Sequence, residues 1–295
     1  MPPLRLFRSL AAIALLVPVA RVSAQDIPTG DSTVQRIYDE GMHRSHAAQL
    51  AQVLMDSIGP RLTGSPANRA ANDWLVRTYK SWGVDAKNEQ YGTWRDWTRG
   101  VSGLTLVAPR TRVLEATMHA WSAATPPGGV TAEVVTLPTV AEFGDSAGFS
   151  RWLATVKGKL VLASMPQPSC RPDSDTRFWA DSVVYRQSVA LRDSATAAWG
   201  ARFTAARVSN RALPALLERA GAAGMLSNSW SRGWGVDKIQ SARARTIPSF
   251  DVSCEDYSLL ARLAANGQHP RVHALADASL APNETPVFNT VARIE

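Results

Sequence analysis

The chain has 295 residues, of which 45% are hydrophobic and 19% are charged, and its formal net charge is +7. A soluble globular chain of this length can bury a sizeable core and hold two domains, because a domain takes roughly 100–200 residues. Its arginines are scattered along the sequence rather than clustered. The composition therefore argues against a nucleic-acid partner, which would need a basic face to follow the phosphates.

The first 24 residues are predicted to be a secretory signal peptide rather than part of the fold. Arg5 and Arg8 precede an apolar run at residues 10–20, and small residues end the segment at Ala24. This run is shorter than the ~20 residues that span a bilayer. We therefore expect a secreted or periplasmic protein without a stable membrane anchor. Cleavage would also remove Arg21, which leaves a formal charge of +4 (7 − 3).

Two helices separated by a turn are expected after this leader. Residues 33–57 predict the first helix, with Gly41 as a candidate break, and Gly59-Pro60 ends it because a proline and the residue before it leave the helical conformation. Ser65-Pro66 then starts a second helix, since serine caps free N–H groups and proline fits the first helical position. Small and apolar residues recur at spacings of three and four as far as Trp82, which predicts one buried stripe.

Beyond residue 83 the sequence predicts a mixture of strands and helices. Strands are expected at residues 84–89, 91–97, 101–107, 113–121, 130–137 and 158–163, with a short helix at 142–153. The Pro-Pro-Gly-Gly loop at 126–129 is the best candidate for a domain edge.

The second half continues this mixture. Residues 176–208 predict one or two amphipathic helices that form an insert or lid. Further expected elements are a helix at 213–220, a strand at 224–228, an extended segment at 247–250, a helix opened by Ser253 in a capping box, and a strand at 287–294.

Four segments carry a family resemblance. Residues 58–65 read Ile-Gly-Pro-Arg-Leu-Thr-Gly-Ser, residues 125–134 Thr-Pro-Pro-Gly-Gly-Val-Thr-Ala-Glu-Val, residues 219–226 Arg-Ala-Gly-Ala-Ala-Gly-Met-Leu, and residues 288–292 Phe-Asn-Thr-Val-Ala. In this order they resemble four features of the M28 family of zinc exopeptidases. These are its opening signature, the entry into an inserted protease-associated (PA) domain, the helix-to-strand turn of that insert, and the strand that re-enters the catalytic domain.

The resemblance implies a fold class and a division of the chain. The fold would be α/β, with an incomplete zinc-exopeptidase α/β domain of amino-terminal helices and edge strands that carries a PA α+β insert. The exopeptidase part would take residues 25–104, the PA-like insert residues 105–280, and the strand returning to the catalytic domain residues 281–295.

The resemblance also implies a chemistry. Enzymes of this family hold two zinc ions with histidines and carboxylates, including a His-x-Asp motif and a Glu-Glu pair, so that a metal-bound water attacks the bond of a peptide or dipeptide. This sequence contains neither His-x-Asp nor Glu-Glu. We therefore expect no catalytic, cofactor-binding or metal-binding residue in the chain, no bound zinc and no turnover by the chain alone; a homodimer is compatible with the resemblance. The alternative is a non-enzymatic secreted module that binds peptide or glycan.

The five histidines have structural interpretations. His43 and His46 could share one helical face, but no carboxylate accompanies them at ligand spacing, so an exposed polar face is expected. His119 lies in an apolar predicted strand, where a hydrogen-bonded histidine of the core or sheet edge is expected. His269 and His273 flank Pro270 at a loop–strand junction and are expected at the surface.

Other residues that could be taken for catalytic groups also have structural interpretations. Glu255-Asp256 is interpreted as the capped, acidic start of a helix, and Asn228-Ser229-Trp230 is not a nucleophile elbow. Cys170 and Cys254 form either a disulfide or two separate thiols.

Five tryptophans could line a groove that binds a substrate or a glycan: Trp94, Trp97, Trp121, Trp230 and Trp234. Tryptophans in strands usually fill a core, which is the expectation here. Trp230 and Trp234, in a polar loop, would form a contact surface if they are exposed.

Overall fold

The computed structural model describes residues 30–229, 233–235 and 241–294. The predicted signal peptide, residues 1–24, and Trp230 lie outside the described residues. The chain divides into two compact units, one ending at Ser57 and the other beginning at Ile58. Within the described part, none of the helices combines the length and apolar character needed to cross a bilayer.

The described part of the first unit is helical. α1 (Ser32–His43) is followed by α2 (Ala47–Gln52), which continues into a π-helical turn, η1 (Val53–Ile58). The single helix predicted over 33–57 is therefore divided at residues 44–46 and not at Gly41. Glycine costs a helix only about 1 kcal/mol, whereas Ser45 accepts a hydrogen bond from the N–H of Ala47 and so favours a new helix start.

The second unit begins with the helix that the sequence predicts. In α3 (Pro66–Ser81), the hydroxyl of Ser65 accepts from the N–H of Asn68 at 3.1 Å, and proline occupies the first turn. Gly64 has a φ of +79°, and a Cβ there would lie 3.1 Å from the carbonyl oxygen of Arg95. Glycine at this position allows both the turn and the close approach of the neighbouring strand.

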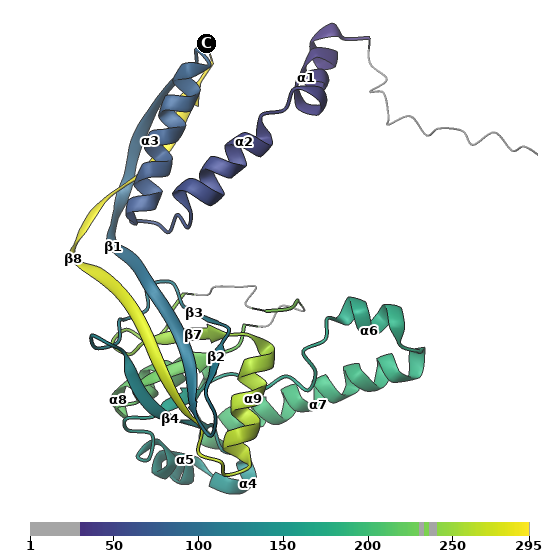
Figure 1. Ribbon diagram of the computed structural model, residues 1–295, viewed down its shortest axis with the longest axis vertical. Helices are drawn as coiled ribbons and strands as arrows, with labels where there is room; N and C mark the ends of the chain where they lie inside the picture. The colour runs from purple at the N-terminus through teal and green to yellow at the C-terminus, as the bar shows by residue number, and fades with distance from the viewer. Residues whose placement is uncertain (1–29, 230–232, 236–240, 295) are drawn as a thin grey trace, which may run out of the picture. The chain divides into compact units, whose positions relative to one another are not determined.

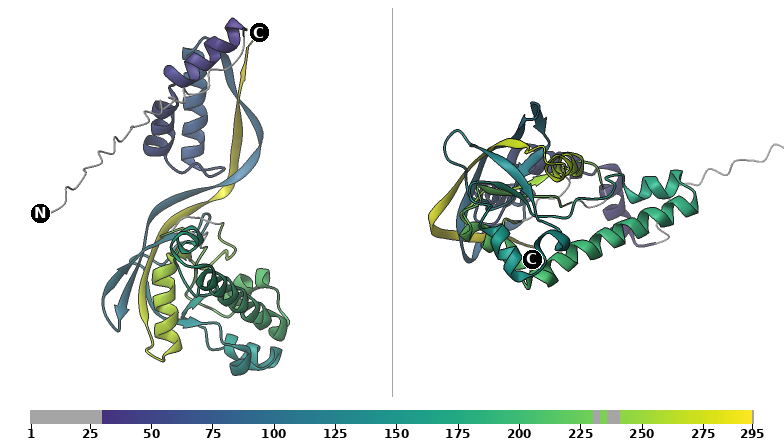
Figure 2. Two further views of the ribbon diagram at one scale, coloured as in Figure 1. Left: turned by 90° about the vertical axis from the view of Figure 1, so that its right-hand side faces the viewer. Right: turned by 90° about the horizontal axis from the view of Figure 1, so that it is seen from below.

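Two long antiparallel strands, β1 (Asp85–Ala108) and β8 (Arg271–Arg293), pair along almost their whole length. The register shifts at four places, including Gln90/Gly92 and Arg99/Ser102. Such β-bulges increase the local twist, and Figure 2 shows the strands winding around each other. The three strands predicted over 84–107 are thus one, because pairing with β8 continues across the glycines and charged residues that appeared to separate them.

The long strands belong to an eight-stranded sheet of order β2-β1-β8-β4-β5-β6-β7-β3 (Figure 1). β4 (Val130–Thr136) pairs antiparallel with β8 and then parallel with β5 (Leu160–Leu162). β6 (Gly224–Ser227) and β7 (Ser249–Val252) continue the parallel part, so four strands share one carboxyl edge. The strand predicted at 113–121 is divided into β2 (Arg112–Leu114) and β3 (Ala116–Met118), which form the two edges.

Helices pack on both faces of this sheet. α9 (Cys254–Ala265) covers one face and forms a first hydrophobic core with it. A second hydrophobic core includes residues from four helices: α4 (Val140–Phe143), α5 (Ser146–Leu153), α7 (Ser182–Ala206) and α8 (Leu213–Arg219). A 3-10 turn, η2 (Asn210–Ala212), precedes α8. Leu160 and Leu162 belong to the core under α9, whereas Val161 between them belongs to the second core. This alternation is that of a strand buried on both faces.

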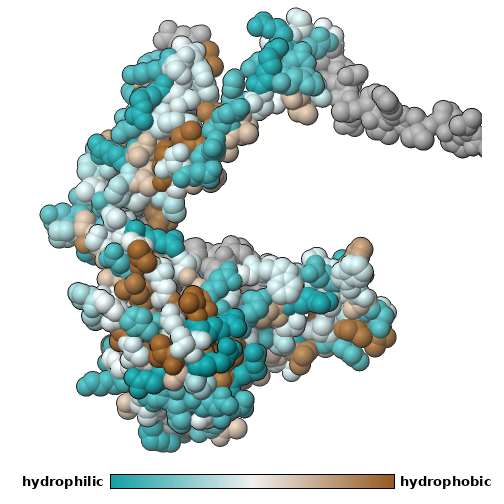
Figure 3. All heavy atoms as spheres, in the orientation of Figure 1, coloured by the Kyte–Doolittle hydropathy of each residue, from teal (hydrophilic) through white to brown (hydrophobic). Residues whose placement is uncertain are grey.

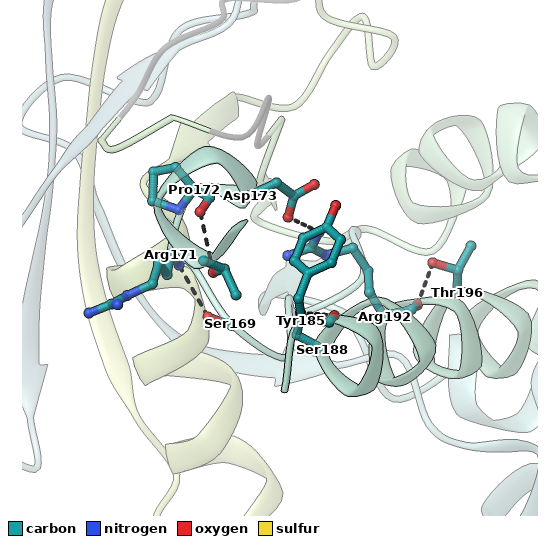
Figure 4. Close-up of polar contacts among 9 residues, drawn as sticks. Ser169, Arg171, Pro172, Asp173, Tyr185, Ser188, Arg192 and Thr196 are labelled. Carbon is teal, nitrogen blue, oxygen red and sulfur yellow. Dashed lines mark hydrogen bonds and ion pairs between the residues drawn. The ribbon is translucent and has the colours of Figure 1, made fainter. Parts of the chain in front are cut away.

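The insert expected over 176–208 is a helical hairpin of α6 (Asp173–Trp179) and α7. An ion pair between Arg192 and Asp173 joins the two helices (Figure 4). Phe178 and Trp179 at its end are 77% and 76% exposed, and Figure 3 shows hydrophobic side chains gathered there. Of the one or two helices predicted here, the structure has two; an insert or lid remains a prediction.

The structure also bears on the two cysteines and on the predicted domain boundaries. Cys170 and Cys254 form a disulfide with a Cα–Cα distance of 5.6 Å, which ties the loop after β5 to the first residue of α9. Both predicted domain boundaries, 104/105 and 280/281, fall inside the long strands β1 and β8. The division into an exopeptidase part and a PA insert therefore stays a prediction.

Candidate functional site

A cavity of about 670 Å³ lies where the chain leaves the parallel strands β5 and β6. The carboxyl edge of parallel strands is the usual ligand position in open α/β sheets, and small-molecule sites have volumes of roughly 300–1,000 Å³. Ser164, just beyond β5, and residues 227–229, at the end of β6, contribute to its lining.

Buried Tyr257 of α9 fixes the position of Ser164. Its hydroxyl donates to the carbonyl oxygen of Ser164 at 2.7 Å and accepts from the N–H of Ser164 at 2.8 Å. Burial raises the pKa of Tyr257, although these hydrogen bonds oppose the shift, so the hydroxyl stays protonated and able to donate. The side chain of Ser164 in turn accepts from the N–H of Asn228 at 3.1 Å, and the Asn228 amide donates to the carbonyl oxygen of Val252 at 2.7 Å. These bonds join the ends of β5, β6 and β7.

His119, only 5% exposed, contributes to the cavity wall. Its Nε2 lies 2.8 Å from the hydroxyl oxygen of Ser227, which lies 3.1 Å from the carbonyl oxygen of Phe250. Because a carbonyl only accepts, the Ser227 proton points to Phe250, and Nε2 donates to Ser227. The prediction of a hydrogen-bonded core histidine is confirmed. In this arrangement His119 does not act as a base toward Ser227.

The rest of the cavity combines hydrogen-bond donors with apolar side chains. Arg243 is exposed and contributes a positive charge, and Trp199, Leu213 and Met225 contribute apolar surface. The described lining residues include no aspartate or glutamate. This composition favours an anion with an apolar body.

A second cavity, of about 420 Å³, is lined by the segment at residues 58–65 that resembles the family signature. Its lining includes Ile58, Pro60 and Leu62 of this segment, together with Trp97 of β1 and Met118 of β3. The family-like segment therefore forms an apolar groove against the sheet.

Comparison with known proteins supports the family resemblance. No family model matches the chain. Carboxypeptidase Q of Mus musculus is 25% identical over 254 residues, which cover 86% of this chain and 47% of that protein. For carboxypeptidase Q of Homo sapiens the identity is 24% over 258 residues, covering 88% and 47%. The chain is thus similar to carboxypeptidase Q over most of its length. The M28 resemblance, inferred from four short segments, is thereby confirmed.

The similarity to carboxypeptidase Q has a limited extent. The chain spans about half the length of the curated relatives it matches. The crystal structure of a Peptidase M28 precursor from Shewanella amazonensis SB2B matches with a TM-score of 0.52 and 19% identity, covering 88% of this chain and 52% of that one. That likeness shows a common mixed α/β fold, as the sequence predicts.

The histidines do not fit a two-zinc centre of the kind that the family implies. His43 ends α1 and His46 precedes α2, so the predicted single helical face does not exist, although both residues are exposed as expected. His269 is exposed and pairs with Glu133 at 2.8 Å, whereas His273 is only partly exposed and its Nδ1 lies 3.0 Å from the Thr131 hydroxyl oxygen. Over residues 30–229, 233–235 and 241–294, no group of three or more His, Cys, Asp or Glu side chains converges.

The interpretation of Glu255-Asp256 as the capped, acidic start of a helix is confirmed, but capping does not fully explain Asp256. Ser253 does cap α9, with its hydroxyl 3.4 Å from the N–H of Asp256. The carboxylate of Asp256, however, accepts from Arg112 at 2.6 Å and from the N–H of Glu115 at 2.7 Å. A buried carboxylate beside an edge strand binds these donors, so Asp256 fastens α9 to the sheet.

The tryptophans divide between core and surface. Trp97 is buried and donates to the carbonyl oxygen of Ser122 at 3.0 Å, as predicted for a core tryptophan. Trp94, in the same strand, is half exposed, and its ring meets that of Trp121 edge-on. Trp234 is exposed, so the condition for a contact surface is met for this residue.

Sequence reasoning did not single out the cavity at β5 and β6. Its lining comes from segments as far apart as His119 and Arg243. The signal that could have located it was the order of the parallel strands, since side chains that follow such strands meet at one edge.

Proposed function

We propose that this chain is the amino-terminal part of an exported zinc-dependent exopeptidase of the carboxypeptidase or dipeptidase type, which hydrolyses a peptide or dipeptide. The observation that carries the proposal is the similarity to carboxypeptidase Q over 86% of the chain. In this proposal two zinc ions and the general base are held by residues that this chain does not supply, so the chain alone has no turnover.

The role proposed for this chain is that of a scaffold. The apolar groove at residues 58–65 is held by α3, which is fastened to the long strands: the Asn72 amide donates to the carbonyl oxygen of Phe288 at 2.9 Å, and the Asn88 amide to Asp73 at 2.8 Å. These bonds fix α3 on β1 and β8. We propose that peptide substrates reach the enzyme over this side of the chain, and that the PA-like residues 105–280 shape their access.

Export is part of the same proposal. The disulfide between Cys170 and Cys254 fits an oxidising compartment, where such bonds form and persist. Mass spectrometry of the mature protein is expected to give an amino terminus at Gln25. Retention of residues 1–24 in protein recovered from the medium or periplasm would contradict the leader. The proposal includes neither a nucleic-acid partner nor a stable membrane anchor. A homodimer is compatible with it.

The test compares this chain with the product of its whole reading frame. Both are purified, supplied with zinc and assayed for release of amino acids from dipeptides. We expect hydrolysis by the whole product, abolished by a chelator, and none by the 295-residue chain. Metal-dependent hydrolysis by the 295-residue chain would refute its inactivity. A reading frame without His-x-Asp and Glu-Glu downstream would refute the peptidase.

The second candidate is a non-enzymatic secreted module that binds peptide or glycan. The exposed Trp234 favours it, because exposed aromatic rings commonly form such contacts. Binding of peptides or glycans by the chain, lost in Trp234→Ala, together with an inactive whole product, would support this candidate over the peptidase.

A further inference from the structure

We propose that the cavity at the ends of β5 and β6 binds a small carboxylate with an apolar body and no free amino group, such as an N-acylated hydrophobic amino acid. The proposal concerns binding by this chain and does not rest on peptidase activity.

The charge of the cavity selects an anion. Arg243 is positively charged and exposed, and no acidic partner is found for it within the described part of the chain. A guanidinium can hold a carboxylate through two parallel hydrogen bonds. Among the described lining residues there is no Asp or Glu, so the ammonium group of a free amino acid would meet no carboxylate there.

Two serine hydroxyls add hydrogen-bond donors. The oxygen of Ser164 already accepts from the N–H of Asn228, so its own proton remains to be donated, and no acceptor for that proton lies among the described residues. Ser229 is held by its N–H, which donates to Asp251 at 2.7 Å, and its hydroxyl likewise has no partner in the described part. Ser164 and Ser229 both belong to the cavity lining.

The remaining lining accounts for the apolar body. Trp199, Leu213 and Met225 offer an aromatic ring and two aliphatic side chains in a cavity of about 670 Å³. His119 Nε2 donates to Ser227, whose hydroxyl donates to the carbonyl oxygen of Phe250, so these two side chains are held in place before a ligand arrives. A preformed wall lowers the ordering cost of binding.

The test is isothermal titration of the chain with four probes. N-acetyl-L-phenylalanine is expected to bind. N-acetyl-L-phenylalaninamide, which lacks the carboxylate, and L-phenylalanine, which keeps the carboxylate but carries an ammonium group, are expected to bind at least tenfold more weakly. Inorganic phosphate, an anion without an apolar body, is expected to give no measurable heat.

Variants locate the binding. Arg243→Gln is expected to weaken N-acetyl-L-phenylalanine at least tenfold and Ser229→Ala severalfold. Arg245→Gln is the matched control, because Arg245 is exposed two residues away and is not part of the described lining. Circular dichroism confirms that each variant is folded. Equal binding of the acid and its amide, unchanged affinity in Arg243→Gln, tighter binding of phosphate, or no binding of the acid would each overturn the proposal.

Discussion

Replacing Tyr257 by phenylalanine tests how the carboxyl end of β5 is held. The change removes one oxygen atom from a buried side chain whose hydroxyl makes two hydrogen bonds with the backbone of Ser164. Each such bond contributes about 0.5–1.5 kcal/mol, and a buried group that loses its partner costs about 1–3 kcal/mol. Ser164 is only partly buried, so water relieves part of this cost. We expect a loss of about 2–3 kcal/mol in the free energy of unfolding, from the same principle.

The measurement is urea unfolding at pH 7 with a thermal scan beside it. At about 2–4 °C per kcal/mol for a chain of this size, the midpoint should fall by about 5–10 °C. Tyr91→Phe is the control, since Tyr91 is exposed and should change stability by less than about 0.5 kcal/mol. Equal stability of Tyr257→Phe and the unsubstituted chain would refute the reasoning.

The same variant predicts a difference at high pH. Because burial raises the pKa of Tyr257 above its ordinary value of about 10, its stabilising contribution is complete below about pH 10. Above that pH the unfolded chain ionises while the folded chain does not, so stability falls by up to ~1.4 kcal/mol per pH unit. Tyr257→Phe should lack this decline. Parallel stability curves for the two proteins above pH 10 would contradict the assignment.

Three further predictions concern other contacts. Replacing both Cys170 and Cys254 by serine removes a disulfide between residues 84 positions apart and should lower the free energy of unfolding by about 4–5 kcal/mol. In the same thermal scans, a reductant should destabilise the unsubstituted chain but not this variant. Glu218 is partly buried, which alone would raise its pKa, but hydrogen bonds from the backbone of Thr246 and its neighbours lower the pKa overall. Its contribution to the free energy of unfolding is therefore present above about pH 4.3 and is lost as the pH falls through the folded-state pKa. Glu218→Gln should thus be less stable by about 1–2 kcal/mol at pH 7 in urea unfolding, and this difference should shrink as the pH is lowered. Asp173→Asn should weaken the ion pair between α6 and α7 and raise amide hydrogen exchange in α6 about fivefold while leaving β5 unchanged; unaltered exchange in α6 would show that the pair does not hold the hairpin.

Local patterns predicted the elements whose ends have chemical markers. Ser65-Pro66 starts α3, the run at residues 158–163 contains β5, and the alternating segment at 130–137 contains β4. Each depends on a cap or on a period of two residues, which neighbours along the chain are enough to establish. The long strands β1 and β8 were not predictable in this way, because their continuity depends on each other across nearly two hundred residues.

At the candidate site, too, some features could be predicted from the sequence and others depended on the fold. The absence of His-x-Asp and Glu-Glu could be read directly from the sequence, and four short segments were enough to indicate the M28 family. The pairing of His119 with Ser227 and the role of Tyr257 could not be read, because these residues are separated by up to 108 positions and meet only in the folded sheet.

The sequence by itself indicated the resemblance to the M28 family, the places where helices begin and the buried character of the short strands, since each depends on residues within a few positions of one another. Only the tertiary structure decided that two cysteines meet, that Asp256 fastens a helix to the sheet, and that donors from distant segments surround one cavity. The physical reason is that hydrogen bonds, ion pairs and cavities depend on distance in space, which strand order sets and sequence spacing does not.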